Sequence, residues 1–225
     1  MKKVFTLLFS WLYFFDSQAQ VTIAYCKIDG GCKFYQTQYS YKDVDNMLGY
    51  MGVFERDKGI MTFFKNKQGQ DVHYPDKKRS PRELHEYFGG KGEPTIAKGG
   101  IIQPFDKTIQ PKDGNWTAQT DKPILKNCPS QLGTQTDNIA SIKSGNRVFS
   151  KPFNPTDLLP NTKWLTLAEN NYRVAILNDT QTAFKTFYTV NVLSPVQITG
   201  VADIYVTIPN QKTCEMKINF TFKAK

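Results

Sequence analysis

The last part of the chain alternates apolar and polar residues with a period of two over two long stretches. Apolar residues share one face from Val196 to Ile208, where only Val201 breaks the pattern. From Cys214 to Phe222 the alternation is unbroken. Successive side chains of a strand point to opposite faces of its sheet. The pattern therefore predicts antiparallel strands with one buried face and one solvent-facing face.

Further strand-like runs precede this pair and are separated by short polar turns. Residues 183–193 form the nearest run, and residues 164–168 and 172–177 flank an Asn-Asn turn. Together these runs predict a twisted antiparallel meander of about six to eight strands. Such a meander can curl into a half-barrel around its apolar face.

Shorter elements are predicted before residue 108. Val21–Cys26 and Cys32–Tyr39 read as a hairpin centred on Asp29, and residues 59–65 and 71–74 read as a second hairpin. Each of two short helices has a sequence signal for its first turn, because a serine precedes an acidic residue by three positions. These helix starts are Ser40 with Asp43, and Ser80-Pro81 with Glu83.

Glycine, proline and lysine dominate residues 89–115, a composition typical of an exposed connector. We place a module boundary near residue 110. The predicted fold class is mainly β (α+β), with an N-terminal α+β module of hairpins and two short helices at 20–110. An antiparallel β module, a meander or half-barrel, is predicted at 111–225.

Residues 1–19 have the layout of a secretory signal peptide. Two lysines precede the apolar run Val4–Phe15, and the small residues Ser17 and Ala19 follow it. The alternative is a membrane anchor, but a span needs about 20 apolar residues and this run is shorter. We therefore expect a secreted or periplasmic protein that does not span the membrane.

Basic residues exceed acidic ones, which gives a formal net charge of +9. Loss of the signal peptide would remove two lysines and one aspartate and leave +8. The densest cluster, Lys77-Lys78-Arg79, is flanked by Asp76 and Glu83 rather than interleaved with aromatic residues. This pattern favours a solvated surface over a nucleic-acid interface. The other hypothesis is association with an anionic envelope partner, such as lipid headgroups or acidic glycans.

Four cysteines in an exported chain predict two disulfides, for which three connectivities are possible. We favour Cys26–Cys32 across the first hairpin and Cys128–Cys214 across a long loop. Metal binding is the alternative, but the spacing of the first pair and the lack of a nearby histidine do not fit a zinc site. We predict no metal and no cofactor.

Candidate acid–base groups are few. Only His73 and His85 titrate near neutral pH, and the chain contains no Gly-x-Ser-x-Gly elbow. His85-Glu86 lacks the second histidine of a zinc-protease motif. Both histidines are therefore interpreted as surface or packing residues. A hydrolase that uses a pair of carboxylates stays open as an alternative.

Aromatic residues are concentrated in the N-terminal module. This concentration favours a small aromatic core over an exposed aromatic patch, because large exposed apolar patches are rare on monomers. The alternative hypothesis is an exposed aromatic patch that binds a sugar, a lipid or a protein partner. Its candidate residues are Tyr35, Tyr39, Tyr50, Phe63, Tyr87 and Phe88.

The C-terminal half resembles a group of uncharacterised exported bacterial β-domains. Those domains open with a Gly-x-Trp strand, carry a cysteine pair and bend strands at Ser-Pro and Gly. The matching residues are Gly114-Asn115-Trp116, Cys128-Pro129, Ser144-Gly145, Ser194-Pro195, Gln197-Ile198-Thr199-Gly200 and Cys214. The resemblance implies an antiparallel β fold in the cell envelope and assigns no catalytic residue.

We therefore expect a non-catalytic exported binding protein of the cell envelope. Its ligand would be a lipid or another hydrophobic molecule held by the concave sheet. Two alternatives are an inhibitor or immunity-type protein that binds another protein, and a carboxylate-dependent hydrolase.

Overall fold

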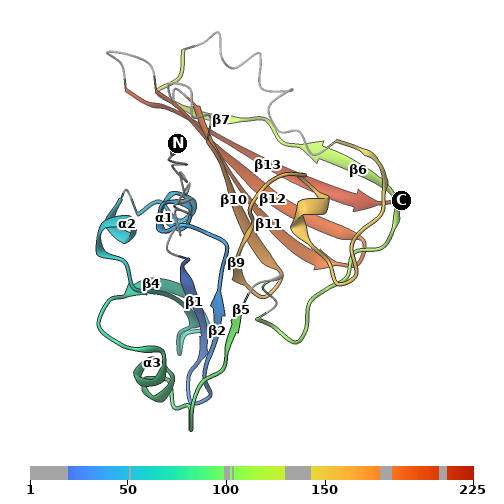
Figure 1. Cartoon of the computed structure of the whole chain (residues 1–225). Coiled ribbons are helices and arrows are strands. Elements are labelled where there is room, and N and C mark those ends of the chain that lie inside the picture. Colours follow the sequence, from blue (N-terminus) through green and yellow to red (C-terminus); the bar gives the residue numbers. More distant parts are fainter. Residues whose placement is uncertain are drawn as a thin grey trace, which may run out of the picture.

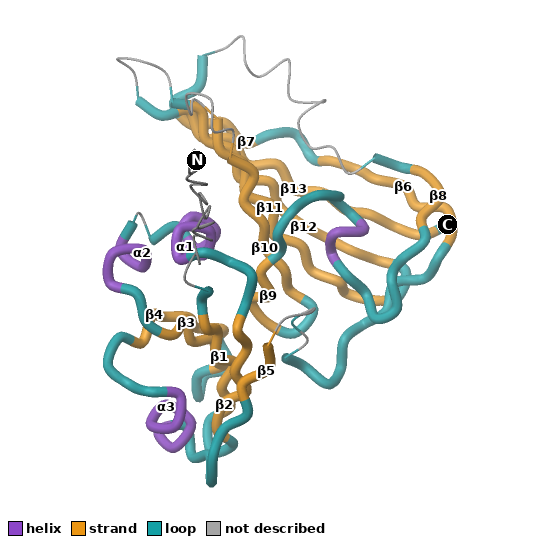
Figure 2. The backbone as a smooth tube through the Cα atoms, viewed as in Figure 1, coloured by secondary structure: helices purple, strands orange, loops and turns teal. Residues whose placement is uncertain are grey.

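A computed structural model describes residues 20–50, 52–98, 102, 104–129, 143–177, 184–207 and 212–225. Figures 1 and 2 show two sheets, a smaller one built from the first half of the chain and a larger one built from the second half. Thirteen strands and three short helices are present in these residues, so the mainly β fold is confirmed. The signal-peptide prediction lies outside the described residues.

The smaller sheet has five strands in the order β4-β3-β1-β2-β5. Its strands are β1 (Thr22–Lys27), β2 (Gly31–Gln36), β3 (Ile60–Lys65), β4 (Asp71–Asp76) and β5 (Ile96–Lys98). Both predicted hairpins are confirmed, with Cys26 opposite Cys32 and a positive φ of 61° at Asp29. The parallel pairs β1–β3 and β2–β5 were not predicted, because period-two alternation carries no information on strand direction.

Both predicted helices are present, as α1 (Tyr41–Leu48) and α3 (Pro81–Tyr87), and each has a complete capping box. A third helix, α2 (Val53–Asp57), was missed. Its first turn follows a glycine and is capped by a side chain of the preceding helix. The buried carboxylate of Asp45 accepts hydrogen bonds from the backbone N–H groups of Gly52 and Phe54. The capping carboxylate belongs to another helix, so the residues directly before α2 carry no sequence signal that predicts where this helix begins.

The larger sheet has eight strands, and all of its pairings are antiparallel. Its strands are β6 (Gly114–Thr120), β7 (Ile124–Lys126), β8 (Gly145–Arg147), β9 (Leu165–Ala168), β10 (Asn171–Leu177), β11 (Phe184–Ser194), β12 (Gln197–Val206) and β13 (Cys214–Ala224). Strands β9 to β13 form the predicted meander. Strands β6 and β7 then pair with the other side of β13, which sequence order did not indicate.

Alternation along β12 and β13 matches the prediction and defines an apolar face and a polar face. On β12 the buried positions are Ile198, Ala202 and Ile204. On β13 the buried positions recur at every second residue from Cys214 to Phe222. The predicted turns at 178–179 and 209–212 lie wholly or largely outside the described residues.

Side chains fill the apolar face of the larger sheet. A loop that contains a short 3-10 helix, Pro155–Asp157, crosses in front of the strands in Figure 1. Phe149, Phe153 and Leu158 of this loop are buried in the same cluster as Ile198 and Ile204 of β12. The half-barrel interior expected as a ligand cavity is therefore a packed core in this part of the molecule.

The two sheets share a hydrophobic cluster. Leu165 of β9 is fully buried among residues of the smaller sheet, including Ile23 and Phe63. The Tyr25 hydroxyl donates a 2.7 Å hydrogen bond to the carbonyl of Thr166. These contacts connect the predicted modules through strand β9, the edge of the larger sheet.

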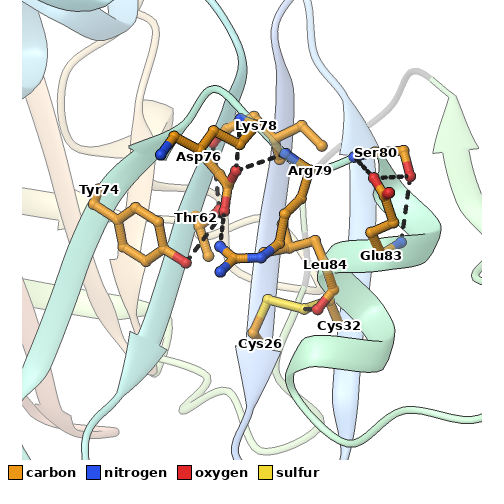
Figure 3. Close-up of polar contacts among 11 residues, drawn as sticks. Cys26, Cys32, Thr62, Tyr74, Asp76, Lys78, Arg79, Ser80, Glu83 and Leu84 are labelled. Carbon is orange, nitrogen blue, oxygen red and sulfur yellow. Dashed lines mark hydrogen bonds and ion pairs between the residues drawn. A yellow bond between two sulfur atoms is a disulfide. The ribbon is translucent and has the colours of Figure 1, made fainter.

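Both predicted disulfides are present, Cys26–Cys32 and Cys128–Cys214. The first crosses the β1–β2 hairpin beneath α3 (Figure 3). The second joins residues 86 apart in sequence and ties the segment after β7 to the start of β13. Disulfides are typical of proteins that fold outside the reducing cytoplasm.

Among the described residues, no helix has both the length and the apolar character needed to cross a bilayer.

Candidate functional site

The six aromatic residues proposed as a patch do not form one exposed surface. Phe63 and Phe88 are buried in different clusters on opposite faces of the smaller sheet. Three of the others are half-buried against the cluster of Phe63: Tyr35, Tyr39 and Tyr50. Only Tyr87, on α3, is well exposed, at 63%. Phe88 at the end of α3 thus packs in one cluster, while Phe63 and the three half-buried tyrosines pack in the other, so the six residues do not share one surface.

His85 is a packing residue. Its Nδ1 accepts a 3.0 Å hydrogen bond from the backbone N–H of Cys32. The imidazole ring lies against two glycines, and a Cβ built at Gly90 would lie 2.2 Å from the ring. The histidine therefore holds the disulfide-bonded hairpin against the end of α3, and any side chain at Gly90 would displace it.

His73 lies on β4 and shares a 2.7 Å hydrogen bond between its Nδ1 and the Tyr50 hydroxyl. Burial lowers the pKa of His73, and the positive charge of Arg173 lowers it further. Both histidines thus have structural partners. In the part of the chain that the structure describes, no group of three or more His, Cys, Asp or Glu side chains could hold a metal ion.

Asp76 is a buried carboxylate at the end of β4 with several hydrogen-bond donors around it (Figure 3). It accepts hydrogen bonds from the backbone N–H groups of Lys78 and Arg79, and from Arg79 Nη1 at 2.6 Å. Burial by itself would raise the pKa of Asp76, but these hydrogen bonds outweigh it and lower the pKa. A carboxylate held in this way shapes the loop before α3 and is a poor proton donor.

A cleft of about 380 Å³ lies where the two sheets meet. It is lined by residues after β2, by the 102–108 connector, by the 153–164 loop, and by β9 and β10. Tyr39, Phe153, Trp164 and Tyr172 contribute aromatic surface from both halves of the chain. This volume falls within the usual range for small-molecule sites.

Hydroxyl and amide side chains supply most of the polar lining. These residues are Thr37, Gln38, Thr108, Asn154, Thr156, Thr162 and Thr166. Lys163 is the one charged lining residue, and its ammonium group lies 3.2 Å from the Asp43 carboxylate of α1. The lining therefore offers hydrogen bonds and one cation, but no carboxylate.

Trp164 has an unusual polar environment. The side chain is 6% exposed, and its indole N–H has no hydrogen-bond partner within the described residues. Buried polar groups are rarely left unpaired, because doing so costs about 1–3 kcal/mol. A lining residue with an unpaired donor is expected where a ligand acceptor or a water molecule completes the site.

Tyrosine ionisation contributes little chemistry to the cleft at neutral pH. Burial, followed by the negative charge of Asp43, raises the pKa of Tyr39 to about 12. Burial also raises the pKa of Tyr172. Both hydroxyls therefore stay protonated, and the Tyr39 hydroxyl donates to the carbonyl of Trp164. The cleft is better suited to binding than to proton transfer.

Of the six aromatic residues predicted as a patch, only Tyr39 lines the cleft. Sequence reasoning missed both Trp164, which it placed at the start of a predicted strand at 164–168, and Phe153, to which it assigned no element. No periodic pattern marks them, because the cleft is assembled from four separate segments.

A comparison of the chain with protein-family models and with curated proteins finds no match in either.

Proposed function

We propose that this is a non-catalytic binding protein of an extracytoplasmic compartment, secreted or periplasmic. In this proposal it holds a small amphipathic ligand in the cleft between its two sheets. Two disulfides support an oxidising compartment. The cleft, with its aromatic surface and polar lining, supports ligand binding.

The unpaired indole N–H of Trp164 carries the proposal. A ligand oxygen that accepted this hydrogen bond would satisfy a buried donor. The aromatic rings would pack against the apolar part of the same ligand. With Lys163 as the one charged lining group, the site favours neutral or anionic molecules over cations.

A long acyl chain fits this arrangement less well than a compact molecule. It would have to displace Phe149, Phe153 or Leu158 from the filled apolar face of the larger sheet. A compact ligand with hydroxyl or carboxylate groups needs no such displacement. We therefore narrow the expected ligand from a lipid to a compact amphipathic molecule.

Fluorescence of Trp164 tests the proposal. Trp116→Phe leaves Trp164 as the one tryptophan after residue 20. This variant would be titrated with mono- and disaccharides, short-chain fatty acids and aromatic carboxylates, and native mass spectrometry would identify any co-purified molecule. We expect one probe class to bind and to shift the emission of Trp164.

Trp164→Phe is the matched variant, because it removes the indole N–H and keeps an aromatic ring. It should weaken the best probe about tenfold, which corresponds to about 1.4 kcal/mol. Trp116→Phe should bind this probe as the wild type does. Equal binding by Trp164→Phe, or no binding of any probe class by the wild type, would refute the proposal.

A further inference from the structure

The polar face of the larger sheet carries a row of uncharged hydrogen-bonding side chains. Strand register places Asn171 of β10 opposite Asn191 of β11, and Asn191 opposite Thr199 of β12. Thr199 lies opposite Thr221 of β13, which lies opposite Gln119 of β6. Neighbouring strands are about 4.8 Å apart, so these five positions span about 19 Å. The row is a regular ladder of donors and acceptors.

A second row runs beside the first. It contains Arg173, Thr189, Val201 and Asn219 in register across β10 to β13. Side chains of both rows surround a shallow hollow of about 310 Å³ over β11 to β13. The hollow lies on the opposite side of the sheet from the packed loop 149–164, and it shares no lining residue with the inter-sheet cleft.

Unpaired polar atoms lie at the β10 end of both rows. Asn171 Oδ1 and Arg173 Nε are buried and have no hydrogen-bond partner among the described residues. The Arg173 guanidinium lies 5.2 Å from the ring of Phe187. Burial lowers the pKa of Arg173 more than the carboxylate of Asp203 raises it. Arg173 lies opposite Leu165 of β9, which packs against the smaller sheet, so this end of the rows adjoins that sheet. The cation is partly desolvated there, and an external anion that reaches it would compensate its charge.

The charged side chains around these two rows are mainly positive, as binding of an anion requires. On the polar face of β10 to β13, two carboxylates, Asp203 and Glu215, accompany more numerous cations. A third carboxylate, Asp121 after β6, accepts a hydrogen bond from Asn219 of the second row. The cations are Arg173, Lys185, Lys217 and Lys223. Glu215 is already paired with Lys126 of β7. This excess of positive charge complements a polyanion.

We propose that the polar face binds a linear acidic polysaccharide that lies across the strands. Hydroxyl groups of successive sugars meet the Asn, Thr and Gln side chains of the first row. A sugar carboxylate pairs with Arg173 at the end of the second row. Tyr205, two residues beyond Asp203 on the same face, is half-exposed and offers an aromatic surface beside Phe187.

Calorimetric titration with hexagalacturonate tests this proposal, with fully methyl-esterified hexagalacturonate as the uncharged control ligand. We expect binding of the acid form at low salt, at least about tenfold weaker binding of the ester, and loss of affinity as salt rises. Thr199→Glu and Thr221→Glu place negative charge in the first row without disturbing the buried core. Each should reduce the affinity for hexagalacturonate at least about tenfold.

Thr95→Glu is the matched control, because it adds the same charge at an exposed position of the other module. It should bind hexagalacturonate within about twofold of the wild type, since its charge lies away from the polar face. Arg173→Gln should weaken binding as well, and circular dichroism would show that this variant stays folded. Trp164→Phe should leave hexagalacturonate binding unchanged, so this test is separate from that of the cleft.

Several results would overturn the polysaccharide proposal. They are absence of binding at low salt, equal binding of the ester, and unchanged affinity in Thr199→Glu and Thr221→Glu. A concentration-dependent dimer that Thr199→Glu dissociates would also overturn it, because the face would then be occupied by a second copy of the chain.

Discussion

The two sheets reach stable structures by different means. The smaller sheet has strands of three to six residues and mixed pairing. Asp45 and His85 accept hydrogen bonds from backbone N–H groups of other elements, and Asp76 from those of the residues that follow it. Strands β11 to β13 of the larger sheet have ten or eleven residues and pair antiparallel along their length, with a register shift between Val192 and Ser194 of β11. Long alternating strands present one continuous apolar face by local pattern, and the 149–158 loop covers it. Short strands depend on specific contacts made between segments.

Their disulfides show the same contrast. Cys26–Cys32 closes a short hairpin that already has a well-formed turn, whereas Cys128–Cys214 closes a long loop. In the chain-entropy model the stabilisation grows with the length of the closed loop. The larger sheet should therefore depend more on its disulfide than the smaller one does.

Removing the disulfides separately gives the largest expected effect. Cys128→Ala with Cys214→Ala should lower the free energy of unfolding by about 4–5 kcal/mol, and Cys26→Ala with Cys32→Ala by about 2 kcal/mol. Urea denaturation monitored by circular dichroism measures both. An equal or larger loss of unfolding free energy in the Cys26→Ala, Cys32→Ala variant would contradict the expected difference between the two disulfides.

Leu165→Ala should lower the free energy of unfolding by about 3 kcal/mol, because it opens a cavity in the cluster shared by the two sheets. Hydrogen exchange should accelerate in both β1 and β10. Leu84→Ala is the control, since Leu84 of α3 is equally buried but belongs to the cluster on the other face of the smaller sheet. Its effect should stay within the smaller sheet. Faster exchange in β10 of Leu84→Ala would show that the clusters are not separate.

Asp76→Asn should destabilise the protein by about 2 kcal/mol near neutral pH, because the charged acceptor of four hydrogen bonds is lost. Folding lowers the pKa of Asp76, so its contribution is present above the unfolded-state pKa and is lost as pH falls through the folded-state pKa. Thermal unfolding at a series of acidic pH values should show a weaker acid dependence in the variant.

The matched control is Asp106→Asn, whose carboxylate is exposed and paired with Lys33 at the surface. It should change the melting temperature little at neutral pH, since surface ion pairs contribute little. If both variants melted at the same temperature, the cap at Asp76 would be unimportant for the smaller sheet.

Tyr39→Phe has the smallest expected effect, about 1 kcal/mol, because it removes the hydroxyl that donates to the carbonyl of Trp164. Folding raises the pKa of Tyr39 to about 12. Its contribution is therefore complete below the unfolded-state pKa of about 10 and is lost as pH rises through about 12. Between these two pKa values, Tyr39→Phe should lose less unfolding free energy with rising pH than the wild type does.

Stability measured by urea denaturation from pH 9 to 11.5 would detect this difference. Tyr87→Phe serves as the control, because the Tyr87 ring is largely exposed on α3. Parallel pH curves for the wild type and Tyr39→Phe would exclude a role for this hydroxyl in joining the sheets.

Much of the fold could be predicted because its signals are local. The alternation from Cys214 to Phe222, the turn at Asp29 and the capping boxes at Ser40 and Ser80 each involve residues a few positions apart. Each was confirmed in the structure. The predicted disulfides also followed from one hairpin and from the remaining pair of cysteines.

The candidate site could not be predicted in the same way. Tyr39 is far from Phe153 and Trp164 in the chain, and the three are brought together only where β9 meets the smaller sheet. Helix α2 depends on the carboxylate of Asp45 in another helix, and the parallel pairing of β1 with β3 spans more than thirty residues. None of these arrangements leaves a periodic pattern.

The sequence alone determined the strands with long alternation, the two capped helices and the cysteine pairs, because backbone geometry and nearby side chains decide them. Only the tertiary structure decided that side chains fill the apolar face, that the two sheets share Leu165, and that the cleft forms between them. Those outcomes depend on how separate segments pack in three dimensions. Packing depends on the shape and volume of side chains that are distant in the chain.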